Sequence, residues 1–290
     1  MNSKRLPNPA ALAAVAVLTV FSNVPVASAD AMRAVTYENL GTAWQEDGKL
    51  DAARDAFTRA LSFEPSYAAA HNSLGSVLRQ QGRSAEALAH FQEALRLQPD
   101  FEDAAFNFGN ALAAAGRPDE AIERYRQLLQ RRPKSVDVHA NLGIALASTG
   151  RVDEAIDHFR AAAALAPDTA KPHYNLGHAL MTRGDLPAAI VELSQAVRIA
   201  PTDADARYEL GNAYLASQRL PEAVDQFRET TKLAPGMAEA HNNLGIALGS
   251  MGRMDEAIDA FKAALRIDPG SGDAQANLRA AMAARQRIRN

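Results

Sequence analysis

A repeat of 34 residues runs through most of this chain and restricts its fold more than any other feature of the sequence. A glycine recurs at that spacing in seven copies, at Gly41, Gly75, Gly109, Gly143, Gly177, Gly211 and Gly245. A proline keeps the same register, at Pro65, Pro99, Pro133, Pro167, Pro201, Pro235 and Pro269. Such a period is typical of solenoids, in which each unit buries its apolar face against its neighbours. The pattern predicts seven stacked units, covering 34–67, 68–101, 102–135, 136–169, 170–203, 204–237 and 238–271.

Each copy reads as two helices joined by a tight turn. In the fourth copy, the apolar spacing of three and four residues predicts helices over Val136–Ser148 and Val152–Leu165. Gly150 ends the first helix in the manner of a C-terminal glycine, and Pro167 ends the second. Gln218 takes the place of this turn glycine in the sixth copy, which predicts a less sharp turn there.

Two further positions repeat in the second helix of each copy. The first is always alanine, as at Ala155, and a bulky residue follows four positions later, as at Phe159. The recurring glycine lies inside the first helix, where it costs about 1 kcal/mol relative to alanine. We expect close helix packing to offset that cost, with the alanine fitting against the glycine. The bulky residue is expected to fill the space between one copy and the next.

These motifs closely resemble the tetratricopeptide repeat (TPR) family. The first copy reads Tyr37-Glu38-Asn39-Leu40-Gly41 with Trp44, and later copies read His-x-Asn-Leu-Gly. The resemblance implies an all-α, right-handed superhelical solenoid of antiparallel helix pairs, whose first helices line a concave groove that binds peptides. Residues 272–290 resemble a C-terminal capping helix. There Arg279 replaces the glycine and presents a polar face where stacking must stop.

Asparagines recur at positions that the resemblance places in the groove. Those we assign to binding are Asn107, Asn110, Asn141, Asn175, Asn212 and Asn243, with the aromatic residues Phe106, Tyr174 and Tyr208 beside them. An amide both donates and accepts, so a ladder of amides can hold the backbone of an extended peptide. The repeat arms of O-linked N-acetylglucosamine transferases carry similar ladders. The alternative is that each asparagine only satisfies a neighbouring backbone group.

Charge restricts the ligand. The formal net charge of −3 predicts no attraction to nucleic acid. Acidic residues dominate the expected groove positions, at Glu38, Glu46, Asp103, Asp137, Asp205, Glu209 and Glu239. We therefore expect a neutral or basic extended peptide. A separate basic patch holds Arg124, Arg126, Arg131, Arg132 and Lys134. It suits a helix C-terminus, and contact with an anionic surface is the alternative.

The sequence lacks the usual signs of catalysis. It has no cysteine, phosphate-binding loop, nucleophile elbow or paired-histidine zinc motif. Four histidines share one repeat offset, at His71, His139, His173 and His241. Successive copies are too far apart to share a metal ion, so these histidines are expected to pack or face solvent. We expect no enzyme activity, cofactor or metal.

Residues 1–29 have the layout of a secretory signal peptide. Lys4 and Arg5 precede an apolar stretch from Ala10 to Phe21, and small residues follow up to Ala29. We expect cleavage after Ala29 and a periplasmic or secreted protein. The apolar stretch is shorter than the roughly 20 residues of a spanning helix, so no stable membrane anchor is expected.

The expected function is that of an exported scaffold or adaptor, which binds a protein or an extended peptide in its concave groove. One alternative is a non-catalytic subunit or arm that serves a glycosyltransferase or an envelope-assembly machine supplied by another chain. A glycan-binding or adhesion protein is another.

Overall fold

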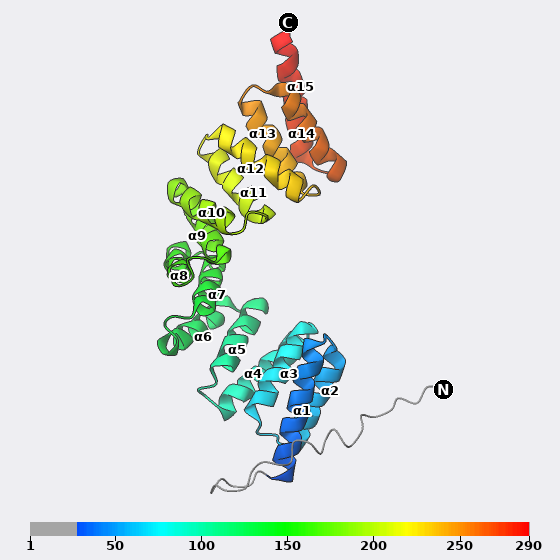
Figure 1. Ribbon diagram of the computed structural model, residues 1–290, viewed down its shortest axis with the longest axis vertical. Helices are drawn as coiled ribbons and strands as arrows, with labels where there is room; N and C mark the ends of the chain where they lie inside the picture. The colour runs from blue at the N-terminus through cyan, green and yellow to red at the C-terminus, as the bar shows by residue number, and fades with distance from the viewer. Residues whose placement is uncertain (1–27, 290) are drawn as a thin grey trace, which may run out of the picture.

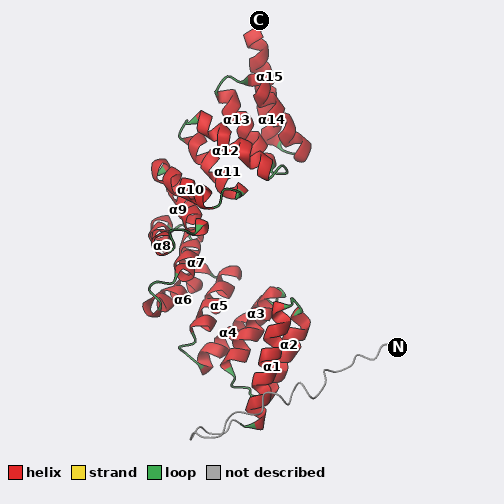
Figure 2. Ribbon diagram, in the orientation of Figure 1, coloured by secondary structure: helices red, strands yellow, loops and turns green. Residues whose placement is uncertain are grey.

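The computed structural model describes residues 28–289, which form fifteen helices and no strand (Figure 2). The first helices of the repeats are α1 (Ala29–Glu46), α3 (Ala68–Gln80), α5 (Glu102–Ala114), α7 (Val136–Ser148), α9 (Ala170–Arg183), α11 (Ala204–Ala216) and α13 (Ala238–Ser250). The second helices are α2 (Leu50–Phe63), α4 (Ser84–Leu97), α6 (Pro118–Arg131), α8 (Val152–Leu165), α10 (Leu186–Ile199), α12 (Leu220–Leu233) and α14 (Met254–Ile267). A final helix, α15 (Gly272–Arg289), follows.

The helix pairs stack one after another into an elongated, bent array, with α1 and α15 at opposite ends (Figure 1). Each first helix also contacts the first helix of the next repeat. Among the described residues, by contrast, successive second helices do not come within 8 Å of each other at any Cα pair. The first helices therefore lie on the inner side of the curve. The expected all-α solenoid of helix pairs is confirmed.

The turn between the two helices has one backbone form in every repeat. Gly150 adopts a positive φ of 78°, and its N–H donates to the carbonyl of Ala147. Gln218 adopts the same left-handed conformation, with φ at 57°, and donates in the same way to Leu215. The expectation of a less sharp turn at Gln218 is wrong, because the flanking helices hold this residue in the conformation that glycine adopts elsewhere.

The glycine inside each first helix lies under a bulky side chain of its own repeat. A Cβ atom at Gly143 would lie 2.6 Å from the ring of Phe159, and one at Gly177 would lie 2.6 Å from Leu193 Cγ. The nearest side chain is thus the bulky residue and not the alanine, which corrects that expectation. The alanine, such as Ala155, is fully buried in the same helix pair.

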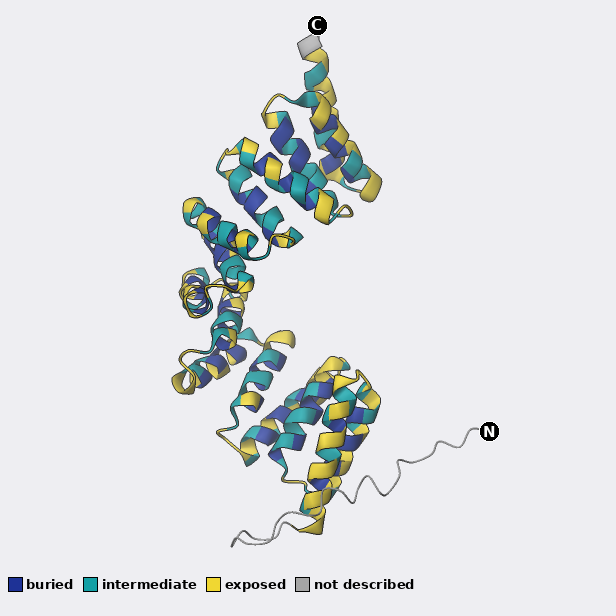
Figure 3. Ribbon diagram, viewed as in Figure 1, coloured by how far each residue is buried: buried dark blue, intermediate teal, exposed yellow. Residues whose placement is uncertain are grey.

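Buried residues, dark blue on the ribbon in Figure 3, run along the array on the facing sides of the paired helices. At the C-terminal end, Ala281 and Leu278 of α15 pack against the last apolar cluster, which includes Phe261. Arg279 is exposed, as expected for a helix that ends the stack. Within residues 28–289, no helix is both long and apolar enough to cross a membrane.

Ion pairs link successive second helices where the backbones stay apart. Arg126 of α6 lies 2.9 Å from Glu154 of α8, and Arg228 of α12 lies 2.8 Å from Glu256 of α14. At the other end of the described chain, the Ser28 side chain accepts a hydrogen bond from the N–H of Ala31 and caps α1. The expected signal peptide lies almost wholly in residues 1–27, outside the described part.

Candidate functional site

A hollow of about 420 Å³ opens between α7, α8 and α9, where the fourth and fifth repeats meet. Its lining includes Ile144 and Ala147 from α7, and Tyr174, Asn175 and His178 from α9. Ile144 is 50% exposed, whereas Val138, Leu142 and Leu146 of the same helix are buried. Ile144 and His178 each directly follow a buried glycine, at the offset where Asn110 and Asn212 bond the next first helix. The hollow therefore lies on the inner side of the array.

Tyr174 is a half-buried aromatic residue at the edge of this hollow. Its ring stacks on that of His178 with centroids 6.3 Å apart, and Lys171 Nζ lies 4.7 Å from the centroid of the Tyr174 ring. Burial raises the pKa of the Tyr174 phenol, and the negative charges of Glu209 and Asp205 raise it further. The surroundings of the hollow toward α11 are thus acidic, which disfavours an anionic ligand.

Five of the six predicted asparagines pair with an amide of a neighbouring repeat. Asn107 Nδ2 donates to Asn72 at 3.0 Å, Asn141 Nδ2 donates to Asn110 at 2.8 Å, and Asn243 Nδ2 donates to Asn212 at 2.9 Å. These bonds join successive first helices. Each amide keeps further donors or acceptors that such a bond does not use. The ladder therefore holds the inner side together while it presents polar groups there.

The two remaining aromatic residues pack inward. Phe106 lies 6.3 Å from the ring of Tyr125, and Tyr208 lies 5.9 Å from that of Phe227. The Tyr208 hydroxyl accepts a hydrogen bond of 3.1 Å from Asn243, and burial is the largest cause that raises its pKa. Both rings support the core and show only part of their surface.

The structure thus brings only Tyr174 and Asn175, among the nine predicted residues, to the hollow. Of the other seven, Asn141 lies on α7 but outside the lining, and the rest lie on first helices of other repeats; all seven contact each other, neighbouring amides or the core. Sequence reasoning missed Ile144, His178 and Thr182. The sequence did contain a signal for two of them. Ile144 and His178 directly follow the recurring glycine, and the same position had led us to select Asn110.

The recurring histidines lie at the outer corner of the repeats. His71 Nε2 lies 3.1 Å from the carbonyl oxygen of Pro65, and its Nδ1 lies 2.9 Å from Nδ1 of His90. His139 and His158 repeat this arrangement at 3.0 Å. No group of three or more potential metal ligands occurs within the described residues. These contacts join each repeat to the proline of the one before.

Comparison with known proteins identifies the family. A family model described as "Tetratricopeptide repeat" matches residues 39–100, 106–170 and 208–272. The chain belongs to the tetratricopeptide repeat family. Two further models of TPR repeats match residues 177–218 and 78–124. A search of curated proteins gave no match.

Solved TPR structures resemble the array. The crystal structure of MamA is 29% identical over 56% of this chain and 94% of its own, with a TM-score of 0.54. A tetratricopeptide repeat protein from Parabacteroides merdae covers 87% of this chain and 99% of its own, at 16% identity and a TM-score of 0.63. In the Cut9–Hcn1 hetero-tetramer of the APC/C, the matched chain is 20% identical over 84% of this chain and 48% of its own, at a TM-score of 0.63. TPR proteins are generally non-catalytic scaffolds that mediate protein–protein interaction.

Proposed function

We propose that this protein is an exported, non-catalytic scaffold that binds an extended segment of a partner protein along its first helices, with the main contacts in the fourth and fifth repeats. The observation that carries the proposal is the hollow between α7 and α9, with Ile144 half exposed beside it. An exposed apolar side chain in a concave site, near polar groups that fix orientation, is typical of a binding surface.

The polarity of the hollow favours a particular kind of ligand. Ile144, Ala147 and Val152 offer an apolar surface for one side chain of the partner. Asn175 lies in the same lining and can bond a peptide group of the backbone. Because Glu209 and Asp205 lie toward the next repeat, a neutral or basic segment is favoured over an acidic one.

Export is the second part of the proposal, and the sequence of residues 1–29 supports it. The periplasm or the cell exterior is then the compartment in which a partner should be sought. N-terminal sequencing of the protein from its native host should begin at Asp30. A protein that keeps Met1 after export would contradict the proposed processing.

Site-specific crosslinking tests the binding surface even before the partner is identified. A photoreactive amino acid replaces Ile144 in one variant and Val191 in the other. Val191 is a matched control, since it is an apolar residue 59% exposed on the second helix α10. After irradiation in the native host, we expect discrete adducts from position 144 and none from position 191. Equal labelling at both positions, or adducts only at 191, would place the binding surface elsewhere.

Affinity measurements follow once crosslinking has supplied a partner. Ile144→Lys should weaken binding at least tenfold, because it places a charge in the apolar part of the hollow. Asn175→Ala should weaken it about fivefold, since a peptide group left unpaired costs on the order of 1 kcal/mol. Asn175 is a cleaner target than Asn107 or Asn141, whose amides also join neighbouring helices.

A further inference from the structure

One repeat differs from the others at its outer corner. The position four residues before the recurring glycine is large in six repeats and small in the third: Tyr37, His71, Ala105, His139, His173, Arg207 and His241. In five of these, the side chain reaches the carbonyl oxygen of the preceding proline, as His139 does to Pro133 at 3.1 Å and Arg207 does to Pro201 at 2.8 Å. Ala105 has no such side chain, so the corner of the third repeat stays open.

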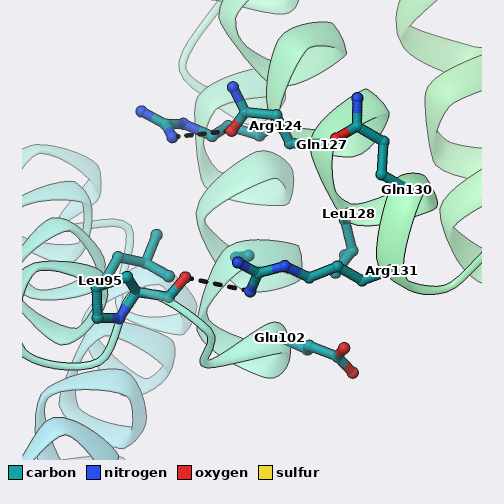
Figure 4. A pocket seen from close by; sticks show the side chains of 9 residues that line it. Leu95, Glu102, Arg124, Gln127, Leu128, Gln130 and Arg131 are labelled. Atoms are coloured by element: carbon teal, nitrogen blue, oxygen red, sulfur yellow. Dashed lines mark hydrogen bonds between the residues drawn. The ribbon is translucent and has the colours of Figure 1, made fainter.

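A hollow of about 330 Å³ occupies that corner and is called here the third-repeat pocket (Figure 4). Its lining is Leu95, Pro99, Glu102, Ala105, Arg124, Gln127, Leu128, Gln130 and Arg131. The apolar part comes from the end of α4 and from Ala105. The two arginines project from α6, seven residues and therefore about two helical turns apart, so they share one face. A pocket of this volume is large enough for one or two side chains.

The two arginines of the pocket have weak polar partners. Arg131 Nη1 donates to the carbonyl of Pro99 at 3.4 Å, and Arg124 Nη1 donates to Gln127 Oε1 at 3.3 Å, both long for such bonds (Figure 4). The Arg124 guanidinium also lies 5.3 Å from the centroid of the Phe108 ring. Within residues 28–289, neither guanidinium forms an ion pair.

The carboxylates near the pocket are already engaged with other arginines. Glu102, which lines the pocket, is paired with Arg132, and Glu120 is paired with Arg117. Two guanidiniums without an ion pair of their own thus border an apolar floor.

We propose that the third-repeat pocket binds an acidic-aliphatic segment of a partner protein. The guanidinium of Arg131 holds the carboxylate of a glutamate or aspartate, because its planar donors fit that group, and Arg124, two helical turns away on α6, adds positive charge at the other end of the pocket. The aliphatic side chain next to it lies on Leu95 and Ala105. The exposed amide of Gln127 bonds the backbone between them. Charge complementarity selects this occupant, since a basic segment would meet the same two arginines.

This site is separate from the hollow between α7 and α9 and has the opposite charge preference. The inner hollow has acidic neighbours, whereas the third-repeat pocket has basic ones. One chain can therefore hold a neutral or basic segment on its inner side and an acidic segment at its outer corner. A scaffold with these two sites brings two different partners together.

Nuclear magnetic resonance titration of the full chain tests the pocket directly. The probe is the peptide acetyl-Gly-Leu-Glu-Gly-amide, and its matched control carries glutamine in place of glutamate. We expect the probe to shift the backbone amide of Ala105 and the side-chain amide of Gln127, with at least tenfold weaker binding of the control. Inorganic phosphate at the same concentration should displace the probe less than free glutamate does.

Three variants locate the site. Ala105→His restores the residue type of the neighbouring repeats, fills the pocket and leaves every charge in place. It should fold as the parent does and lose at least tenfold in affinity. The double variant Arg124→Gln and Arg131→Gln should lose as much. The double variant Arg126→Gln and Arg160→Gln is the control, because both of its arginines are paired with carboxylates outside the pocket, and it should bind within twofold of the parent.

Several results would overturn the proposal. The first is the absence of any chemical-shift change at millimolar probe, and the second is equal affinity for the glutamate and glutamine peptides. The third is an affinity equal to that of the parent in Ala105→His or in the double variant of Arg124 and Arg131. Stronger displacement by phosphate would assign the pocket to phosphate instead of a carboxylate. If Ala105→His fails to fold, the arginine variants still decide the outcome. None of these results changes the expected crosslinking at Ile144, so the two proposals fail separately.

Discussion

At position 218 a glutamine carries a backbone conformation that glycine adopts in the other turns. Its φ of 57° costs an L-residue about 1 kcal/mol relative to glycine. Gln218→Gly should therefore stabilise the array by about 0.5–1 kcal/mol, after allowance for the greater freedom of glycine in the unfolded chain. Urea unfolding followed by circular dichroism measures the change.

Gly150→Gln is the reciprocal variant. Nothing lies within 4 Å of a Cβ placed at Gly150, so the substitution tests the backbone alone. It should destabilise the protein by about 1 kcal/mol. A Gln218→Gly variant that is less stable than the parent would show that the glutamine side chain contributes more than its backbone costs.

The histidine pairs make stability depend on pH. The pKa of His90 is lowered by burial first and by the charge of His71 second, and the pKa of His158 is lowered in the same way by burial and His139. Unfolded histidine takes up its proton near pH 6.5. The stabilisation is therefore complete above about pH 6.5 and is lost as pH falls toward the lowered values.

Urea midpoints measured between pH 7.5 and pH 5 check this dependence. The double variant His90→Gln and His158→Gln should lose less stability over that range than the parent does. As a control, His178→Gln should behave like the parent, because His178 is exposed and belongs to neither pair. Parallel pH curves for the parent and the double variant would rule out the pairs as the cause.

Some residue roles followed from the sequence and others did not. The offset after the glycine selected Asn110 as a candidate groove residue. The same offset contains Ile144, which residue type alone gave no reason to select. Asn107 was expected to face a ligand, but its amide also donates to Asn72 of the previous repeat. That bond depends on the distance between the two side chains in space, which the spacing of residues along the sequence does not give.

Within the helix pair, the glycine and the bulky side chain act as one unit. Gly143→Ala would place a Cβ 2.6 Å from the Phe159 ring, inside the range that real structures avoid. The helices must shift or the ring must turn, at a cost of about 1–3 kcal/mol. We expect a lower melting temperature in calorimetry, with the helical content unchanged below it.

Gly249→Ala is the matched control in another first helix. Its Cβ would lie 3.7 Å from Ala257 Cβ, an ordinary contact, and alanine is the better helix former. This variant should be as stable as the parent or up to about 1 kcal/mol more stable. Equal destabilisation by both alanines would mean that helix flexibility, and not the ring contact, explains the recurring glycine.

Helices were predictable because their signals are local. The apolar spacing and the turn glycine of the fourth repeat place α7 and α8 at the bounds that the structure shows. The partner of each glycine was not predictable in the same way, because the facing residue depends on how the two helices cross. The left-handed form of Gln218 likewise comes from its flanking helices and not from its own preference.

For the whole molecule, stability should follow the number of repeats. Each repeat contacts mainly its neighbours, so free energies of unfolding approximate a sum of repeat and interface contributions. Deleting residues 136–169 joins Ser135 to Ala170. Ser135 and Thr169 are both N-cap residues, so α9 still begins after an equivalent residue and the repeat register is kept. A folded, shorter array should result.

Deleting residues 136–152 is the control for that experiment. It removes α7 and leaves α8 without the helix against which its apolar face packs. This variant should show lower helical content and a broad melting transition by circular dichroism. If both deletions unfold the protein to the same degree, the seven-repeat register is wrong.

The different spacing on the two sides of the array ties its curvature to small movements between repeats. Successive first helices touch and act as pivots, whereas successive second helices are separate and joined through ion pairs such as Arg126–Glu154. A pull on the two ends straightens such an array by narrowing the gaps between second helices. The packing of each second helix against the next first helix resists this change more than the exposed ion pairs do, since such pairs are weak. The hollow beside Ile144 lies between two repeats, so a change in curvature alters its width. Tension on the ends of the array and occupancy of this hollow should therefore influence each other.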